Sequence, residues 1–355
     1  MRNITDLAQH QTEAGYEVGL VCGPIDALHP PRNFDANLFR LGINRVPIRR
    51  KPGVGDVAAI LQVRRALKAM KPDITHAHGA KGGLYSRIAR VGATIYSPHG
   101  GVLHYGGVSA RPLFFVERQL LRRTDGLVFV AEYEKNSFRD KIAPPGGNAR
   151  LIYNGLDEDD FVPLPFAQKE YDVAFMGHLR ALKGVDVLID AMRILAEDGH
   201  RPRLLIAGPG TRAEVDRYKG LIERLGLSNV TLVPHSVDVR ARLASAKLAV
   251  MPSLAEALGY FALEVAAVGV PLIATSAGGL PEVFGPTARR LVPPGDPQAL
   301  ANAIAQHLEN LDQAESEAKL RQEHVRATFT KRAMFEGTER VYAEALANRR
   351  LVPEP

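Results

Sequence analysis

Short apolar segments alternate with helical patterns along this chain, and the alternation restarts after residue 170. Runs rich in Val, Ile and Leu that are too short for helices indicate buried strands. Strands separated by helices favour parallel sheets. We predict strands at 17–22, 73–78, 93–97, 126–130 and 149–153, and after the restart at 171–176, 203–207, 230–233 and 247–251. The pattern therefore predicts an α/β chain with two doubly wound parallel sheets.

The restart divides the chain into two domains, as its 355 residues also suggest. An acidic run at 157–160, followed by Pro163 and Pro165, marks a composition shift that suits a linker. We predict a first domain at 1–162, a linker at 163–170 and a second domain at 171–330. A final helix is predicted at 331–350.

The composition is that of an ordinary globular protein, with 46% hydrophobic and 24% charged residues. No segment approaches the roughly 18 unbroken apolar residues of a membrane-spanning helix. The first residues lack the apolar core of a signal peptide. Cys22 is the single cysteine, which excludes an internal disulfide framework, and it lies in a run typical of a buried strand. These features favour a cytoplasmic protein.

The net charge of +6 comes from the first half of the chain. Residues 1–165 hold 22 Lys and Arg against 16 Asp and Glu, and the remainder holds 23 of each. The excess is either a solvated surface or a contact with an anionic membrane or nucleic acid. No nucleic-acid motif or aromatic interleaving accompanies it, which favours the membrane. Much of the excess lies at Arg40, Arg45, Arg49, Arg50, Lys51, Arg64, Arg65, Lys68, Lys71, Arg118, Arg122 and Arg123.

Two carboxylates stand out in the segment 251–273, which reads as a strand end, a glycine-containing loop, a helix and a turn. Glu256 falls in the loop, and Glu264 falls in the first turns of the helix. Ligands of open α/β sheets lie outside the carboxyl ends of the strands, so both side chains are expected to face one crevice. Neither has an obvious basic partner at helical spacing, and we interpret both as unpaired.

Three loops of the second half follow predicted strands, at 177–184, 208–210 and 253–261. Lys183 lies in the first of them, directly before a helix. Helix N-termini expose N–H groups that favour anions, so a lysine at this position suits a phosphate. On its own Lys183 would be interpreted as a solvated lysine. Because two more glycine-containing loops and two carboxylates are expected nearby, we interpret Lys183 as part of a binding site.

Together these segments form a recognisable pattern. Glu256 and Glu264 stand in an E-x7-E arrangement between Pro252 and Pro271, and further matching segments occur at 153–161, 177–185, 207–210 and 276–282. The chain resembles, over nearly its whole length, the retaining glycosyltransferases of the GT-B fold in the GT4 group (glycosyl transferases group 1). The resemblance implies two Rossmann-like domains facing a central cleft, with the final helix crossing back to the first domain.

The resemblance also implies roles for the matching residues. Glu264 would accept hydrogen bonds from the ribose of a nucleotide sugar, and Glu256 would hold hydroxyls of the donor sugar. Lys183 would neutralise the diphosphate leaving group, with no metal and no cofactor. His99 would lie near the transferred sugar, with a purely structural role as its alternative. The predicted catalytic residues are Glu256, His99 and Lys183, and the predicted donor-binding residues are Glu264, Lys183, His178, Arg180, Gly208, Gly259, Tyr260 and Phe261.

The implied activity is transfer of a hexose from a nucleoside-diphosphate sugar to a hydroxyl of a lipid-linked or cell-surface glycan. Such an enzyme would serve polysaccharide or lipopolysaccharide biosynthesis, in the cytoplasm or peripherally at the inner face of the plasma membrane, without a nucleic-acid partner. A nucleotide-sugar epimerase or a phosphorylase of the same fold are alternative enzymes. A nucleic-acid-binding protein and a non-catalytic sugar-nucleotide-binding protein are alternatives of another class. The base, the sugar and the acceptor are not identified by the sequence.

Three features depart from the family pattern. His178 replaces an arginine, so diphosphate binding is expected to be weaker or to use Arg180. Ala257 and Leu258 replace the usual Gly-Phe after the first glutamate. The family's first strand and glycine-rich acceptor loop have no counterpart at the start of the chain. We therefore expect an N-terminally shortened form, which the intact mass of the native protein would test.

Overall fold

The computed structural model describes residues 2–24, 34–48, 53–235 and 238–350. Contacts divide the chain into two compact units. Unit 1 runs to Asn154 and resumes at Lys331, and unit 2 is Gly155–Thr330. Three residues of the predicted basic cluster, Arg49, Arg50 and Lys51, lie outside the described residues.

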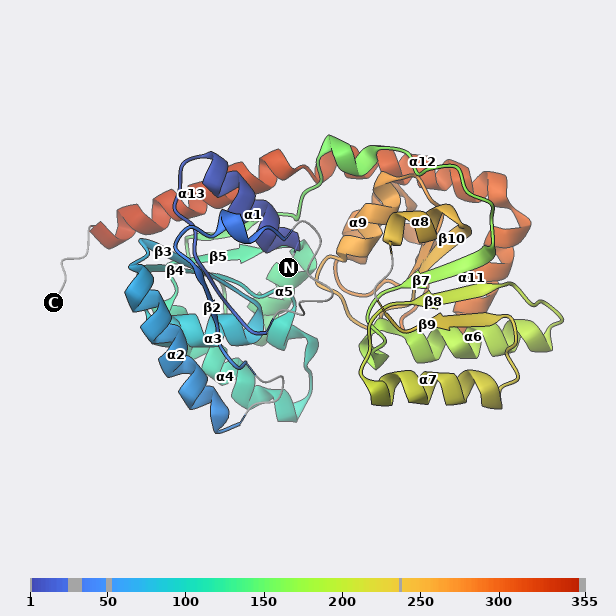
Figure 1. Ribbon diagram of the computed structural model, residues 1–355, viewed down its shortest axis with the longest axis horizontal. Coiled ribbons are helices and arrows are strands. Elements are labelled where there is room, and N and C mark those ends of the chain that lie inside the picture. Colours follow the sequence, from blue (N-terminus) through green and yellow to red (C-terminus); the bar gives the residue numbers. More distant parts are fainter. Residues whose placement is uncertain (1, 25–33, 49–52, 236–237, 351–355) are drawn as a thin grey trace. The chain divides into compact units, whose positions relative to one another are not determined.

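Unit 1 contains two parallel sheets (Figure 1). The smaller sheet pairs β1 with β2, and the larger has the order β3-β4-β5-β6. Each strand of the larger sheet is joined to the next by a helix, as the alternation predicts. Strand β2 is not among the predicted strands, and β1 is shorter than predicted. The strands are β1 (Leu20–Cys22), β2 (Ile43–Arg45), β3 (Ile74–His78), β4 (Ala93–Ser97), β5 (Gly126–Phe129) and β6 (Ala149–Leu151).

The helices of unit 1 lie on both sides of the larger sheet. In Figure 1, α1 and α13 lie on one side of it and α2, α3 and α4 on the other. The α-helices are α1 (Arg2–Glu13), α2 (Gly55–Met70), α3 (Gly79–Ala89), α4 (Arg111–Leu120), α5 (Glu132–Lys141) and α13 (Lys331–Arg350). Short 3-10 helices are η1 (Ala36–Leu38), η2 (Gly101–His104), η3 (Val108–Ala110) and η4 (Leu121–Arg123).

Helix α3 corrects the prediction of a flexible turn at 79–83. These residues form the first turns of the helix, although three of them are glycines. A Cβ atom on Gly83 would lie 2.2 Å from the ring of Tyr96, so the glycine lets α3 approach β4 closely. Tertiary packing thus overrides the low helix propensity of glycine.

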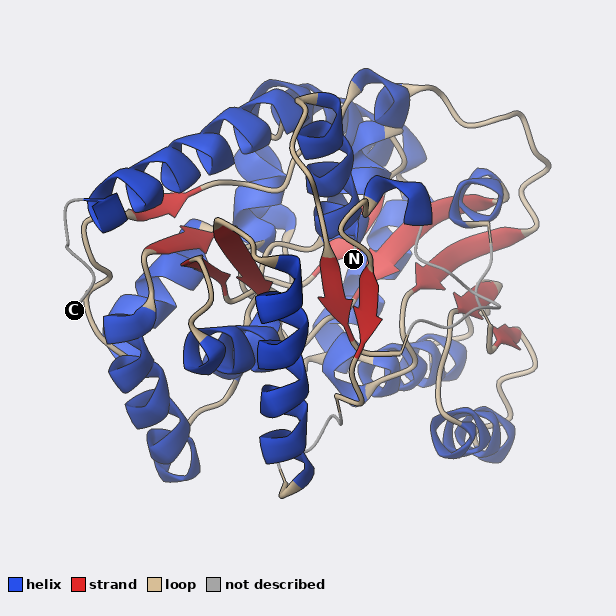
Figure 2. Ribbon diagram, turned by 60° about the vertical axis from the view of Figure 1, so that its left-hand side comes forward, coloured by secondary structure: helices blue, strands red, loops and turns tan. Residues whose placement is uncertain are grey.

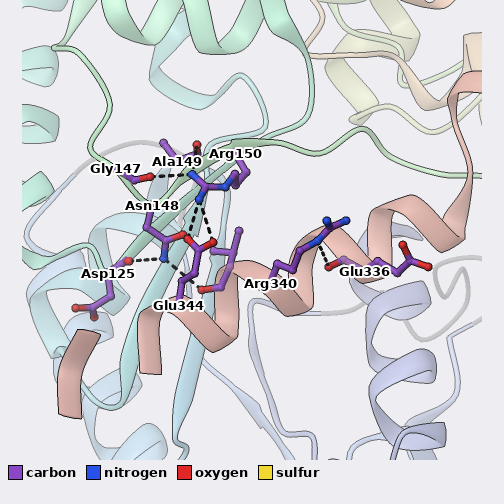
Figure 3. A network of polar contacts seen from close by, with 9 residues as sticks. Asp125, Gly147, Asn148, Ala149, Arg150, Glu336, Arg340 and Glu344 are labelled. Carbon is purple, nitrogen blue, oxygen red and sulfur yellow. Dashed lines mark hydrogen bonds and ion pairs between the residues drawn. The ribbon is translucent and has the colours of Figure 1, made fainter. Parts of the chain in front are cut away.

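Helix α13 is fixed to the larger sheet by packing and by polar contacts (Figure 3). It packs on β4, β5 and β6, and its Val341 and Ala345 are fully buried. Arg150 makes two hydrogen bonds of 3.0 and 2.9 Å to the carboxylate of Glu344. The Asn148 amide donates to the backbone oxygens of Asp125, at 2.9 Å, and Val341, at 3.2 Å. These contacts make the helix part of unit 1.

Unit 2 is built on one parallel sheet with the order β11-β10-β7-β8-β9, and helices enclose its strands (Figure 2). The strands are β7 (Tyr171–Met176), β8 (Leu204–Ala207), β9 (Val230–Val233), β10 (Ala246–Met251) and β11 (Leu272–Ala274). The helices are η5 (Glu158–Phe161), η6 (Ala181–Lys183), α6 (Val185–Glu197), α7 (Arg212–Arg224), α8 (Val239–Ala244), α9 (Tyr260–Ala267), α10 (Leu280–Phe284), η7 (Gly285–Arg290), α11 (Pro297–Glu309) and α12 (Leu311–Thr328). A fully buried cluster that includes Val173, Leu188, Ile206 and Leu248 forms its core.

The boundary between the units differs from the predicted end of the first domain at 162. The acidic run forms η5, which starts with a capping box between Asp157 and Asp160. Arg326 of α12 pairs with Glu158 and lies over the ring of Phe161, 4.2 Å from its centre. The run therefore belongs to unit 2, and these partners are too distant in sequence for composition alone to reveal.

Candidate functional site

The predicted binding loops of unit 2 lie at one edge of its sheet. Strands β7, β8 and β10 are parallel, so the loops that follow them leave from the same edge. The backbone N–H of Leu179 donates to Pro209, at 2.9 Å, which joins the first loop to the second. The N–H of Leu254 donates to Leu182, at 2.9 Å, which joins the third loop to the first. The three loops thus form one continuous backbone surface.

Glycines permit these close approaches. A Cβ atom on Gly208 would lie 2.0 Å from the backbone oxygen of Gly177, and one on Gly184 would lie 1.8 Å from that of Pro252. Gly278 likewise meets the backbone oxygen of Glu256, at 1.8 Å. All three have positive φ, at 146°, 72° and 60°, which other residues rarely adopt. Glycine is therefore required where the loops touch.

Lys183 and Glu256 are in direct contact. The Lys183 ammonium donates a short hydrogen bond to Oε1 of Glu256, which also accepts one from the Ser253 hydroxyl at 2.9 Å. Ser253 is fully buried, and its backbone oxygen accepts a hydrogen bond of 2.6 Å from Thr275. The interpretation of Glu256 as an unpaired carboxylate is therefore wrong. Its partner comes from a different loop, which helical spacing could not detect.

The lysine is the more accessible of the pair. The Lys183 side chain keeps 31% of its accessible surface, against 10% for Glu256. The carboxylate is thus held by a buried hydroxyl, while the ammonium lies at the surface of the loop. Such a cation can turn toward an anion that arrives from solvent.

The remaining predicted donor-binding residues occupy the same loops and the helix that follows. His178 is exposed and Arg180 is half-buried, and both lie in the loop before η6. Gly259, with a φ of 95°, caps the N-terminus of α9, which has no side-chain cap. Tyr260 and Phe261 form the first turn of that helix, where backbone N–H groups lack intrahelical acceptors. Glu264 follows in the same helix and is half-buried, and it has partners of its own.

His99 belongs to unit 1, in a loop of unusual backbone conformation after β4. His99, Gly100 and Gly101 all have positive φ, at 50°, 78° and 41°. Glu134, which is fully buried, accepts hydrogen bonds from the backbone N–H of Gly100, at 2.5 Å, and of Val130, at 2.9 Å. A buried carboxylate thus ties this loop to the end of β5, and the left-handed conformation of His99 is maintained by its surroundings.

The His99 ring is held by a second histidine. Nε2 of His99 and Nδ1 of His78 share a hydrogen bond of 2.9 Å, and the two rings stack with their centres 5.1 Å apart. The His78 ring also contacts that of His76, with the ring centres 4.2 Å apart and the planes tilted by 31°. The two nitrogens of His76 bond to Tyr342, at 2.7 Å, and to Ser97, at 2.8 Å. The end of β3 therefore fixes the orientation of His99.

These histidines are neutral at pH 7. Burial lowers the pKa of His99 to about 4 and that of His76 to about 3. Burial also holds the pKa of His78 well below its usual range. Neutral imidazoles can each donate from one nitrogen and accept at the other, so the shared bond restricts His99 to tautomers that suit His78.

Sequence reasoning missed Ser253, His78 and Glu134. His76 and His78 alternate along a strand, which places them on one face and was a usable signal. Ser253 lies three residues before Glu256 within the matching segment, but its hydrogen bond to that carboxylate was not predicted. Glu134 gave no signal, because the strand end and the loop that it joins are distant in sequence.

The described residues contain neither a candidate metal site nor a candidate membrane-spanning helix. No cluster of three or more His, Cys, Asp or Glu side chains within 2–24, 34–48, 53–235 and 238–350 could hold a metal ion. Over the same residues, no helix has both the length and the apolar character to cross a membrane.

The sequence matches two family models over most of its length. Residues 2–155 match the glycosyl transferase 4-like domain, and residues 157–324 match the glycosyl transferases group 1 model. With the two sheets and the loop site described above, these matches show that the chain belongs to the group 1 (GT4) glycosyltransferases of GT-B fold.

Individual relatives agree with this assignment. Glycogen synthase of Mycobacterium tuberculosis is 27% identical over 309 residues, which cover 81% of this chain and 72% of that protein. The putative glycosyltransferase EpsD of Bacillus subtilis is 28% identical over 286 residues, covering 74% of each chain. Sucrose-phosphate synthase from Thermosynechococcus elongatus has a similar structure, with a TM-score of 0.79, 24% identity, and coverage of 96% of this chain and 92% of that one. The structure of Anabaena HepE with UDP and glucose gives a TM-score of 0.74, with 18% identity and 96% and 95% coverage.

Proposed function

We propose that this protein transfers a hexose, with retention of anomeric configuration, from a nucleoside-diphosphate sugar to a hydroxyl group. The acceptor is a lipid-linked or cell-surface glycan, and the enzyme works without a metal at the cytoplasmic face of a membrane. Family membership supports glycosyl transfer. HepE, a structural neighbour, has been crystallised with UDP and glucose, which makes a UDP-hexose the first donor to test.

The contact between Lys183 and Glu256 is the observation that carries the proposal. The ammonium satisfies the carboxylate in this structure. A diphosphate carries more charge than one carboxylate and would draw the exposed ammonium away from Glu256. Glu256, still held by Ser253, would then accept hydrogen bonds from the sugar hydroxyls. One pair thus serves two parts of the same donor.

The bond changes of the reaction suit this arrangement. The bond between the anomeric carbon and the diphosphate oxygen breaks, and the acceptor oxygen bonds to the same carbon. The leaving diphosphate takes the electron pair of the broken bond and gains negative charge, and it then accepts the proton that the acceptor hydroxyl loses. Lys183 and the N–H groups at the start of α9 would stabilise that charge, because fixed positive groups favour a developing anion. Glu264, farther along α9, would bind the ribose.

A screen of nucleotide sugars tests the proposal. A donor that binds the folded state raises the midpoint of thermal unfolding. We expect at least one UDP- or GDP-hexose to raise the midpoint. With an acceptor extract, we expect the same donor to yield a glycoside detectable by mass spectrometry.

Two outcomes would contradict glycosyl transfer. Conversion of the donor sugar to its epimer, without a glycoside, would indicate an epimerase. Donor binding with neither hydrolysis nor transfer, for every acceptor extract, would indicate a non-catalytic binding protein.

A further inference from the structure

The segment from Tyr105 to Arg123 presents large apolar side chains to solvent. Tyr105 is 59% exposed, Val108 73% and Phe115 64%, and Leu113 and Val116 are also exposed. The segment comprises η3, α4 and η4 with the loop before them (Figure 1). Single exposed apolar residues are ordinary, but five within one short segment indicate a contact surface.

These exposed side chains do not belong to the side of α4 that packs in the core of unit 1. The other side of α4 is already packed, since Glu117 and Leu120 are buried and Phe114 packs against the cluster around Phe129 and Phe138. Helix α4 therefore has one face in unit 1 and another that is both apolar and accessible.

Arginines accompany the apolar side chains. Arg111, Phe115 and Arg118 follow one another at helical spacing along the exposed side of α4, and Arg122 and Arg123 continue the segment. Glu117 is the only acidic residue between 105 and 123, and it is buried against Arg87 with hydrogen bonds of 3.0 and 2.8 Å. The accessible surface of this segment is therefore apolar and positive, with no exposed carboxylate.

The arginines remain available to a ligand. Within the part of the chain that the structure describes, no carboxylate forms an ion pair with Arg111, Arg118 or Arg122. The loop before α4 is also held in place, because the Lys141 ammonium donates to the backbone oxygens of Leu103, at 2.5 Å, and Tyr105, at 3.4 Å. The surface is thus presented by a fixed backbone.

We propose that the segment 105–123 docks on an anionic lipid surface, with Phe115, Leu113 and Val116 entering the acyl boundary. Apolar side chains flanked by arginines match the interface between acyl chains and anionic headgroups. Long arginine side chains can reach the headgroups while their stems stay in apolar surroundings. The proposed function places the enzyme at a membrane, and this segment is the surface that would contact it. The docking proposal rests on that membrane location and on no other part of the proposed function.

Vesicle co-sedimentation of the full chain tests the proposal. The probes are vesicles of phosphatidylcholine alone and of phosphatidylcholine with phosphatidylglycerol at about 2:1. We expect binding to the anionic vesicles, little binding to the neutral ones, and loss of binding at about 0.5 M salt. F115S is expected to weaken the partition by about tenfold, and L113S with F115S by more.

Matched controls lie on unit 2. Phe166 is fully exposed, at 101%, and the Arg212 side chain is 97% exposed. F166S and R212S should leave vesicle binding unchanged, whereas F115S and R118S should reduce it. Equal losses in both sets, equal binding to neutral vesicles, or no binding would overturn the proposal. Self-association that F115S abolishes, without vesicle binding, would instead show that the face binds a second copy.

Failure of this proposal can be told apart from failure of the proposed function. Donor-induced thermal shift and donor hydrolysis in detergent-free buffer need no membrane, and F115S should leave both unchanged. Retained donor chemistry without vesicle binding would overturn only the docking surface. Vesicle binding without donor chemistry would overturn only the proposed function.

Discussion

The polar groups of the two units are held by different means. In unit 2, Lys183 and Glu256 sit on loops that touch through glycines and backbone hydrogen bonds. In unit 1, His99 lies on a strained loop whose position depends on side chains, namely His78 and the buried Glu134. Unit 2 thus carries its charged pair on loops that are joined by backbone contacts, and unit 1 holds a neutral ring through polar side chains, namely the half-buried His78 and the buried Glu134.

The difference indicates what each region can do. The charged pair of unit 2 can exchange partners, because its ammonium is accessible. His76, His78 and His99 of unit 1 are half-buried and neutral, so they suit hydrogen bonding to a neutral partner, such as a sugar hydroxyl, better than charge neutralisation. Changes to the charged pair or its loops in unit 2, and to the histidines in unit 1, should therefore have different effects.

Removing the ammonium should have the largest effect. Lys183→Ala removes the accessible ammonium that pairs with Glu256, and we expect turnover to fall by about 100- to 1,000-fold. Lys183→Arg should recover part of the rate, since it keeps the charge. Steady-state kinetics with the donor found by the screen would measure both. A rate for Lys183→Ala within a factor of about three of wild type would remove Lys183 from the chemistry.

Adding a side chain where two loops of unit 2 touch should strongly reduce the free energy of unfolding. Gly184→Ala adds a Cβ atom against the Pro252 backbone at a positive φ, so we expect a loss of about 3 kcal/mol. Gly226 has a φ of 63° with open space around it, so Gly226→Ala should lose only about 1 kcal/mol. Urea unfolding measures both. Similar losses in the two variants would show that the contact between loops is unimportant.

Breaking the histidine relay should slow turnover moderately. His78→Phe keeps a ring to stack on His99 but removes the hydrogen bond, and we expect kcat to fall by about tenfold with little change in KM for the donor. His78→Asn can place a polar atom near the position of Nδ1 and should recover much of the rate. Recovery of the rate in the asparagine variant would show that His78 acts through its hydrogen bond to His99 and not through packing of its ring. Equal rates in both variants would contradict a role for the hydrogen bond.

Acidification should loosen unit 1 before unit 2. The pKa of His99 is lowered to about 4 and that of His76 to about 3, against about 6.5 in an unfolded chain. Between the folded-state and unfolded-state pKa values, the unfolded chain therefore binds more protons than the folded one. The stability that the neutral histidines contribute is complete above about pH 6.5 and is lost as pH falls toward 4. Burial lowers the pKa of His307 in unit 2 as well, but there a single ring is involved.

Hydrogen exchange resolved by peptide, and corrected for intrinsic rates, measures this effect. Between about pH 7 and pH 5.5 we expect protection of β3 and β4 to fall by about tenfold relative to β7 and β8. His76→Leu should flatten the pH dependence in unit 1. A parallel decline in both units would contradict the difference between them.

The sequence was sufficient for features that depend on local pattern. The alternation of strands and helices predicted the parallel sheets. Because the loops that carry Lys183 and Glu256 each follow a predicted parallel strand, the sequence also predicted that they lie at one edge of the unit 2 sheet. The ranges of β4 and β7 were predicted without error. These features depend on periodicity and on short spacings, which one sequence displays.

Other features depend on contacts between distant residues. The helix at 79–83 exists because Gly83 accommodates Tyr96, and propensity alone indicates a turn. Glu256 was interpreted as unpaired because Lys183 is 73 residues away. The domain boundary was placed too late because the partners of η5 lie in α12. Each error concerns a pairing that only the folded chain reveals.

Single-turnover transfer by Glu256→Ala tests the central claim most directly, with nucleotide-sugar binding measured on the same preparation. Glu256 is held by Ser253 and paired with Lys183, so we propose that it acts on the donor sugar after the lysine moves to the diphosphate. We predict loss of transfer, with donor affinity reduced by no more than about tenfold, because the diphosphate and ribose contacts remain. Unchanged transfer by Glu256→Ala would contradict the account.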